Sequence, residues 1–248
     1  MWRSPRRRRG RCAASVREHC AAATCCSTWS RDGAMSGGPA VATILVIFAI
    51  IEERLQVLLV HRDEPPEAEL WALPGGLWDG GRTLEQAAQA KLFEETGARD
   101  VYLEQLFTES GLDPTHPGVA IAYFALVEAK AVRLRERADD AWRPAWLPVD
   151  DLPPLAFSNG RVIAQAVERV RAKLDYTNIA YGLLPERFTL RELQAAYEAI
   201  LAARLDRRNF RKRMLSTALI EATEDVRREG AHRPARLYRF TSREPVFL

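Results

Sequence analysis

Regular patterning of apolar and polar residues begins only at about Val41, and the first patterned residues resemble strands. Two apolar runs rich in β-branched residues, Ala42–Ile50 and Leu55–Val60, are separated by a short polar break at residues 52–54. Such a pair is typical of a β-hairpin. Three further apolar runs predict additional strands: Val101–Phe107, Val119–Val127 and Trp146–Val149.

A helix is predicted between the hairpin and the later strands. Thr83 is followed three residues later by Gln86, the spacing of a capping box, in which each side chain bonds to the other residue's backbone N–H. The helix should therefore start near residue 84, and Gly97 provides the left-handed residue that commonly ends a helix. Its buried stripe is predicted from apolar residues spaced four apart: Leu84, Ala88 and Leu92.

A second helix is predicted from about Asn159 to Leu174, with Ser158 as its N-cap. Its apolar face is predicted from helical spacing: Val162, Ala166, Val167 and Val170. The helical pattern then breaks at residues 175–186, which contain Asn178, Gly182 and Pro185, and we expect a linker there.

A second module is predicted after this linker. Thr189 and Glu192 form another capping box, and Asp206 is placed to cap a second short helix. The apolar stripe of the first helix is predicted at six positions: Leu190, Leu193, Ala196, Tyr197, Ile200 and Leu201. Apolar runs at 219–226 and 235–240, with a turn around Gly230, predict a hairpin after the two helices.

The second short helix is strongly basic on one side. Phe210 and Met214 lie four residues apart and should face inward. The outer face and its flanks are then occupied by hydrogen-bond donors: Arg207, Arg208, Asn209, Arg211, Lys212 and Arg213. Arginine and asparagine reach base edges in the major groove, and flanking cations suit phosphates. The simpler interpretation is a solvated basic face, but the following hairpin, with His232, Arg233 and Arg236 near its tip, favours the wing of a DNA-binding winged helix.

Charge is segregated along the chain, although the net charge is only +3. Residues 36–185 carry 14 basic and 22 acidic side chains, whereas residues 186–240 carry 13 basic and 8 acidic ones. An acidic body joined to a basic module suggests a polyanionic partner for the C-terminal end.

The first 40 residues differ from the rest of the chain. They contain all four cysteines and the arginine run at 6–9 but no apolar periodicity, so we expect a disordered basic extension. A nucleic-acid-binding arm is one interpretation, and translation starting at Met35 is the interpretation we favour. The cysteine spacing does not indicate a zinc site, and the cysteine-free body fits a reducing cytoplasm. No continuous apolar segment has the length of a membrane span.

Residues 71–97 resemble the Nudix box, G-x5-E-x7-R-E-U-x-E-E-x-G-U, where U is aliphatic. Six residues are in register with this pattern: Gly76, Leu92, Glu94, Glu95, Gly97 and Ala98. Three charged positions depart from it, because Arg82 and Lys91 replace glutamates and Ala90 replaces the arginine. The resemblance implies a pyrophosphate-binding site in which the charges needed for catalysis are changed.

These substitutions disfavour a divalent cation, because Mg2+ takes hard oxygen ligands and an ammonium group opposes it. Lys91 and Arg82 are instead candidates to attract a diphosphate directly, with Glu94 and Glu95 in the same site. We therefore predict no catalytic residues, no metal ligands and no Mg2+. The alternative is that Lys91 and Glu95 are only a solvated ion pair one helical turn apart, worth about 0.3–0.5 kcal/mol.

A Nudix-like body followed by these two helices and a wing is similar to the Nudix-related transcriptional regulators of NAD metabolism, the NrtR family. The resemblance implies a Nudix-like α/β/α sandwich at 41–174, a linker at 175–186 and a winged helix-turn-helix domain at 187–248. It further implies a homodimeric cytoplasmic repressor of NAD biosynthesis or salvage genes, which binds operator DNA and senses ADP-ribose or a related nucleotide. It assigns four more residues to the ligand: Arg62, Trp71, Gly75 and Gly76.

Two other functions remain open. The chain could be a divergent Nudix pyrophosphatase acting on ADP-ribose, with an accessory DNA-binding module, because Glu94 and Glu95 remain. It could also be an architectural DNA-binding protein with a vestigial cleft. Hydrolysis of ADP-ribose distinguishes the first, and the lack of any ligand response distinguishes the second.

Overall fold

The computed structural model describes residues 40–99, 101–110, 118–134, 143–228 and 234–247. The basic extension before residue 40 and the wing-tip residues His232 and Arg233 lie outside these ranges. The elements follow one another along the chain as β1 (Ala40–Ile51), β2 (Arg54–His61), β3 (Trp71–Ala72), β4 (Gly75–Leu77), α1 (Leu84–Thr96), β5 (Tyr102–Ser110), β6 (Gly118–Leu126), η1 (Ala129–Ala131), β7 (Arg143–Pro148), α2 (Asn159–Lys173), η2 (Ile179–Leu183), β8 (Phe188–Thr189), α3 (Leu190–Leu201), α4 (Arg207–Ser216), β9 (Ile220–Arg227) and β10 (Ala235–Phe240).

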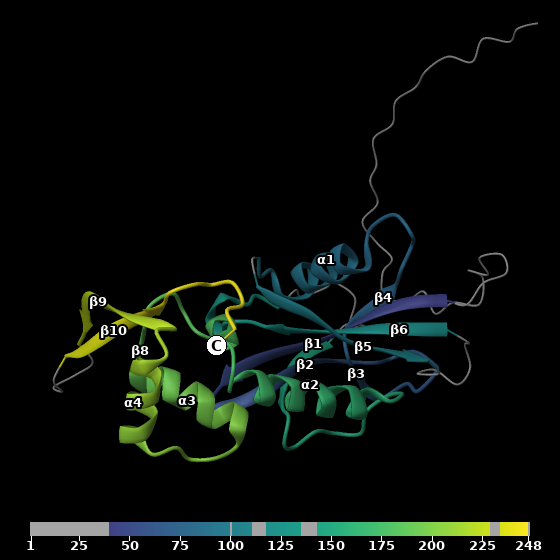
Figure 1. Cartoon of the computed structure of the whole chain (residues 1–248). Helices are drawn as coiled ribbons and strands as arrows, with labels where there is room; N and C mark the ends of the chain where they lie inside the picture. The colour runs from purple at the N-terminus through teal and green to yellow at the C-terminus, as the bar shows by residue number, and fades with distance from the viewer. Residues whose placement is uncertain (1–39, 100, 111–117, 135–142, 229–233, 248) are drawn as a thin grey trace, which may run out of the picture.

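The first module is a mixed seven-stranded sheet with one helix on each face. Its strand order is β3-β2-β1-β6-β5, with β4 paired to β1 and β7 paired to β2. The predicted hairpin is confirmed, since β1 and β2 pair antiparallel. In Figure 1, α1 covers one face of the sheet and α2 covers the other, which is the α/β/α sandwich expected from the sequence.

The second module contains α3, α4 and a three-stranded sheet in the order β8-β10-β9. β9 and β10 are the two strands of the predicted hairpin, and they pair antiparallel. Figure 1 shows this module beyond one end of the α/β/α sandwich, so the helix-turn-helix and its wing project away from the large sheet.

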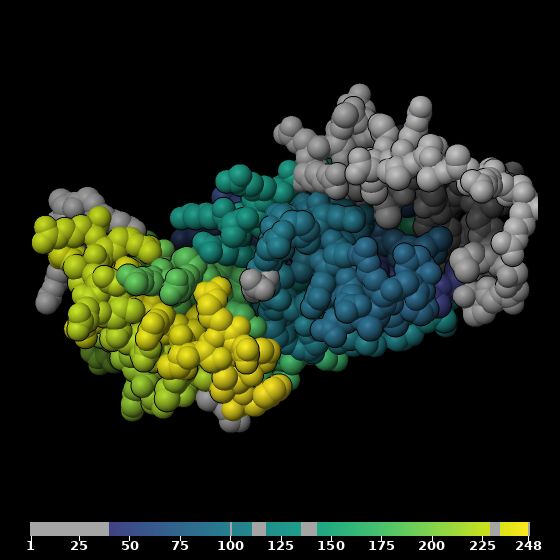
Figure 2. All heavy atoms as spheres, turned by 90° about the horizontal axis from the view of Figure 1, so that it is seen from above, coloured from purple at the N-terminus to yellow at the C-terminus, as the bar shows by residue number. Residues whose placement is uncertain are grey.

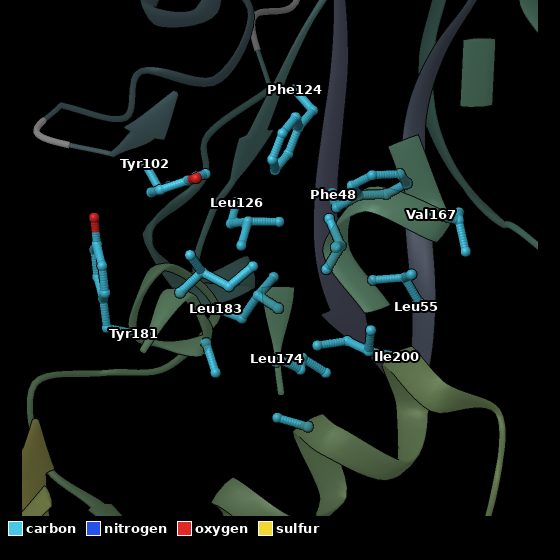
Figure 3. Packing of buried hydrophobic residues seen from close by; sticks show 14 of the residues in the cluster. Phe48, Leu55, Tyr102, Phe124, Leu126, Val167, Leu174, Tyr181, Leu183 and Ile200 are labelled. Atoms are coloured by element: carbon cyan, nitrogen blue, oxygen red, sulfur yellow. The ribbon is translucent and has the colours of Figure 1, made fainter. Parts of the chain in front are cut away.

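One hydrophobic core joins the two modules. It includes Phe48 and Phe124 from the large sheet and Ile200 from α3, all buried in a single cluster. Figure 3 shows Ile200 and Leu174 on the side of this cluster nearest α3. The apolar stripe predicted for α3 forms part of this core, because Leu193, Ala196, Tyr197 and Ile200 are buried, while Leu190 and Leu201 pack against it.

Residues 175–186, expected to form a linker, connect the modules but are largely buried. η2 is buried along its whole length, and Thr177 and Asn178 are at most 1% exposed. Asn178 donates to the carbonyls of Ser242 and Glu244, and its carboxamide oxygen accepts from the N–H of Val246. The C-terminal residues thus return to cover the connection; in Figure 2 they lie, in yellow, against the first module.

One local expectation, the N-cap of α2, needs correction. Ser158 precedes α2 as predicted, but its side chain makes no capping hydrogen bond. Instead Asn159, the first residue of α2, accepts from the backbone N–H of Leu73 at 2.6 Å, inside the core. In the described ranges, no helix is both long enough and apolar enough to cross a membrane.

Candidate functional sites

α4 presents the basic surface predicted from the sequence. Asp206 caps the helix by accepting from the N–H of Asn209 at 2.8 Å. Phe210 and Met214 are buried, and the Phe210 ring meets Tyr197 of α3 edge-on with centroids 5.2 Å apart. This packing fixes the rotation of α4, so that every predicted donor on it is exposed: Arg207, Arg208, Asn209, Arg211, Lys212 and Arg213.

The wing is tied to α3 by charged contacts. Arg227 of β9 donates to the Glu192 carboxylate at 2.6 Å, and Glu192 also closes the capping box with Thr189. Burial raises the pKa of Glu192, but hydrogen bonds from Thr189 and Arg227 outweigh it, so its pKa lies below the usual value. Arg236 is exposed on β10, where a wing residue can face a phosphate backbone.

One cation of α4 already has a partner outside the DNA-binding module. Arg213 donates to the carboxylate of Asp175 at 3.2 Å, and Asp175 lies just past the end of α2. Both side chains are about half exposed or more. The C-terminal end of the basic surface is therefore in contact with the segment that follows α2.

The helix of the Nudix-like motif, α1, forms as expected. Thr83 and Gln86 make both hydrogen bonds of the capping box, and Gly97 ends the helix with φ at 66°. Ala88 and Leu92 are buried, whereas Leu84 is only partly buried. The motif is thus held on a regular helix against the sheet.

Lys91 and Glu95 form a buried ion pair on α1. Their charged atoms lie 2.8 Å apart, and Lys91 is 6% exposed while Glu95 is 1% exposed. Glu94 is more accessible, with its carboxylate 3.8 Å from the Lys91 ammonium. The alternative that Lys91 and Glu95 form a solvated pair is wrong, because both side chains are almost fully buried.

This burial changes the chemistry available to the motif. Desolvating two charges is costly, and their close pairing offsets that cost only while both remain. Lys91 stands where the Nudix box has a glutamate, and its ammonium group pairs with the Glu95 carboxylate. A hydrolase would instead use carboxylate oxygens here to bind Mg2+. Among the described residues, no three His, Cys, Asp or Glu side chains cluster as a metal site would require.

The diglycine segment lies beside β1. Gly75 and Gly76 belong to β4, which pairs with β1. A Cβ at Gly75 would meet the carbonyl oxygen of Thr43 at 2.6 Å, so only glycine allows this approach, whereas a Cβ at Gly76 would meet nothing within 4 Å. Arg82, at the start of the next segment, is exposed, and its carbonyl accepts from the indole N–H of Trp78 at 2.7 Å.

Arg62 and Trp71 have structural contacts besides any role in binding. The Arg62 guanidinium donates to the carbonyl of Pro66 at 2.9 Å and lies 5.0 Å from the centre of the Phe157 ring. Its Nε is buried and has no hydrogen-bond partner within the described part of the chain. Trp71 is partly buried against the core, and its ring meets His61 edge-on with centroids 5.2 Å apart.

Comparison with known proteins agrees with this architecture. The NUDIX domain model matches residues 41–166, and the model of the NrtR DNA-binding winged helix domain matches residues 180–240. The chain is 34% identical over 215 residues to the ADPR responsive transcriptional repressor NtrR of Acinetobacter baylyi, covering 84% of this chain and 85% of the relative. The chain belongs to the NrtR family. The resemblance inferred from the sequence is thereby confirmed.

Solved structures extend the NrtR comparison to three dimensions. NrtR of Shewanella oneidensis, complexed with a 27mer DNA, superposes with a TM-score of 0.71 at 34% identity, covering 81% of this chain and 93% of that one. A MutT/nudix family protein from Enterococcus faecalis, 23% identical, shares the fold with a TM-score of 0.67 over 84% of this chain and 90% of that one. Among curated relatives, the chain is also 31% identical over 125 residues to an ADP-ribose pyrophosphatase of Methanocaldococcus jannaschii, covering 50% of this chain and 71% of that relative.

Sequence reasoning missed two residues that hold the ends of α2 against other parts of the chain. Asn159 and Asp175, at the two ends of α2, contact the diglycine region and α4 respectively. Neither belongs to a motif, and their partners lie 86 and 38 positions away in the chain. Because these separations are long, no local sequence pattern indicates either contact.

Proposed function

We propose that this chain is a transcriptional repressor that binds a palindromic operator as a homodimer and responds to ADP-ribose or a related nucleotide. Its target genes in this proposal are those of NAD biosynthesis and salvage. The observation that carries the DNA-binding part is the orientation of α4. Its Phe210 and Met214 are buried, and six of the seven residues at 207–213 are exposed hydrogen-bond donors. The A. baylyi relative supports the ligand part, because it is described as ADPR responsive.

In this proposal, the DNA contacts divide by chemistry. Arg208 and Asn209 read base edges, while the flanking cations and the wing contact phosphates. The complete proposed DNA-binding set is Arg207, Arg208, Asn209, Arg211, Lys212, Arg213, Arg233 and Arg236.

The nucleotide is proposed to bind around the Nudix-like motif without a metal. Arg82 is exposed and can meet a diphosphate directly, whereas the Lys91 ammonium is buried and neutralises Glu95 from within. Lys91 then cancels the negative charge of Glu95 in the site, and it reaches phosphate only if its pairing changes. The proposed ligand-binding set is Arg62, Trp71, Gly75, Gly76, Arg82, Lys91, Glu94 and Glu95.

A gel-shift titration tests the repressor directly. A duplex enriched from a random library by the protein serves as operator, a shuffled duplex serves as control, and salt is held constant because affinity depends steeply on it. ADP-ribose should change the operator affinity by about 5- to 150-fold, the usual range of allosteric coupling. Equal affinity for both duplexes would remove the regulator assignment, and indifference to ADP-ribose would remove the sensor assignment.

The second candidate is an ADP-ribose pyrophosphatase. It is favoured by the M. jannaschii relative and by the retained Glu94, and opposed by the enclosure of Glu95. Incubation with ADP-ribose and Mg2+ or Mn2+, followed by analysis for AMP, tests it. AMP release that disappears in Glu95→Gln would establish the enzyme. A melting temperature that does not change when ADP-ribose is added would instead support a purely architectural role.

A further inference from the structure

α2 is a single rigid element that touches the candidate nucleotide site at one end and the DNA-binding module at the other. It contains 15 residues and is therefore about 22 Å long. Its middle packs on the sheet through buried Val162, Ala166 and Val170. Figure 1 shows it across the face of the sheet opposite α1, with α3 beyond one end.

The N-terminal end of α2 is bonded to the strand that leads into the diglycine. The side-chain oxygen of Asn159 accepts from the backbone N–H of Leu73 at 2.6 Å. Both residues are buried, so solvent does not reach the Leu73 N–H. Just before the helix, the N–H of Ala156 donates to the carbonyl of Trp71 at 2.8 Å. A displacement of residues 71–76 therefore acts on the start of α2 through buried hydrogen bonds.

The C-terminal end of α2 is bonded to both helices of the DNA-binding module. Arg171 donates from Nε to the carbonyl of Ile200, at the end of α3, at 2.8 Å. Asp175 accepts from Arg213 of α4 at 3.2 Å. The apolar side chains of Leu174 and Ile200 belong to the same buried cluster, so this junction is packed as well as hydrogen-bonded.

We propose that α2 is the lever that couples the nucleotide site to the DNA-binding helices, with Asn159 and Arg171 as positioning residues at its two ends. The regulatory use of this lever rests on the proposed function. Its mechanical part is independent of any ligand. A packed helix moves as a unit, so a change at Asn159 shifts Arg171 and the carbonyl of Ile200, and with them the mutual placement of α3 and α4.

Position between two sites does not by itself establish coupling, so the test measures the coupling energy between the two ends of α2. Operator affinity is measured without ligand for wild type, Asn159→Ala, Arg171→Met and the double variant. Residues 159 and 171 are 12 positions apart in the helix, or about 18 Å, a separation at which independent sites are additive. If α2 couples the two ends, Asn159→Ala should change operator affinity. The same substitution made in the Arg171→Met background should change it by a factor at least about threefold smaller.

Two controls separate coupling from general damage. Arg169→Met removes a neighbouring arginine that binds Glu104 at 3.0 Å within the first module, so its effect should add to that of Asn159→Ala. Asn159→Asp keeps an acceptor for the Leu73 N–H and should therefore change operator affinity less than Asn159→Ala does. Circular dichroism melting of each variant shows that the compared proteins are folded.

Additive effects of Asn159→Ala and Arg171→Met would overturn the lever, as would an Asn159→Ala variant with wild-type operator affinity. Adding ADP-ribose to the same titrations separates the two proposals. If ADP-ribose does not change the operator affinity of wild type, while the effects of Asn159→Ala and Arg171→Met without ligand are non-additive, the sensor assignment fails and the coupling role of α2 is supported. If wild type responds to ADP-ribose and Arg171→Met responds by the same factor, the lever fails and the sensor stands.

Discussion

Lys91 and Glu95 form a 2.8 Å ion pair on the face of α1 that packs against the sheet, and both side chains are almost fully buried. A buried charge left without its partner is strongly destabilising. We therefore expect Lys91→Met to lower the free energy of unfolding by about 3–5 kcal/mol, whereas Lys91→Met combined with Glu95→Leu should recover most of this loss.

Urea unfolding at neutral pH measures this pair. Lys130→Met is the matched control, because Lys130 is exposed in η1 and its loss should change the stability little. A Lys91→Met variant as stable as this control would mean that the pair is solvated after all. A double variant no more stable than the single one would mean that the surrounding core cannot accept apolar side chains.

The burial of this pair marks the limit of what the sequence predicts. Capping boxes at Thr83 and Thr189 are local, so the starts of α1 and α3 were predicted correctly. Lys91 lies at the edge of the apolar stripe of α1, where sequence periodicity cannot separate a solvated lysine from an enclosed one. Its enclosure depends on the tertiary packing around α1, which the local pattern does not encode.

The same reason explains the segment at 175–186. Asn178, Gly182 and Pro185 have the composition of a linker, but Asn178 bonds residues that lie 64 to 68 positions later. Only the return of the C-terminal residues buries it. Interactions across such separations are set by the tertiary fold, and a single sequence gives no indication of them.

A second prediction concerns the base-reading residues of α4. Arg208→Ala or Asn209→Ala should cost about 1–3 kcal/mol of operator binding and relax sequence preference. Arg211→Ala should weaken binding to all sequences alike, because it removes a phosphate contact. The slope of log K against log salt concentration should become shallower by about one. Gel shifts across a salt series on operator and shuffled duplexes measure both effects. Identical behaviour of the three variants would show that the base-reading face is assigned wrongly.

A third prediction follows from the pKa of Glu192. Burial raises this pKa, but Thr189 and Arg227 lower it more, so the folded state holds the carboxylate ionised below its usual pKa of 4.5. The resulting stabilisation is present above the unfolded pKa and is lost as pH falls through the folded pKa. Glu192→Gln keeps the cap to Thr189 and removes the charge, and should cost about 1 kcal/mol at neutral pH because a third of the side chain is exposed.

Urea unfolding between neutral and acidic pH checks this prediction. The stability difference between wild type and Glu192→Gln should shrink as pH falls below about 4.5, and it should vanish once pH is below the lowered pKa of Glu192 in the folded state. Glu224→Gln serves as the control, because Glu224 is exposed on β9, the strand that carries Arg227. A difference that does not change with pH would show that the charge of Glu192 contributes nothing.

A fourth prediction tests the connection between the modules. Asn178→Asp keeps the acceptor for the N–H of Val246 but removes the two donors to Ser242 and Glu244. Each lost hydrogen bond is worth about 0.5–1.5 kcal/mol, and the new buried charge adds to the loss. We expect lower stability and faster proteolysis after residue 241, measured by limited digestion and mass spectrometry. Digestion at the wild-type rate would mean that the tail is held by its other contacts.

The last prediction concerns metal dependence, which separates a sensor from an enzyme at the same motif. Because the Lys91 ammonium engages Glu95, ADP-ribose should bind with the same affinity in EDTA and in excess Mg2+. The triple variant Arg82→Glu, Ala90→Arg and Lys91→Glu restores the charges of the Nudix box and places carboxylates beside Glu94 and Glu95. Like charges so close repel unless a cation bridges them, so this variant should be less stable in EDTA and regain stability with Mg2+ or Mn2+. Calorimetric titration and thermal melting measure the two effects. Metal-dependent ADP-ribose binding by the wild type would contradict the role assigned to Lys91.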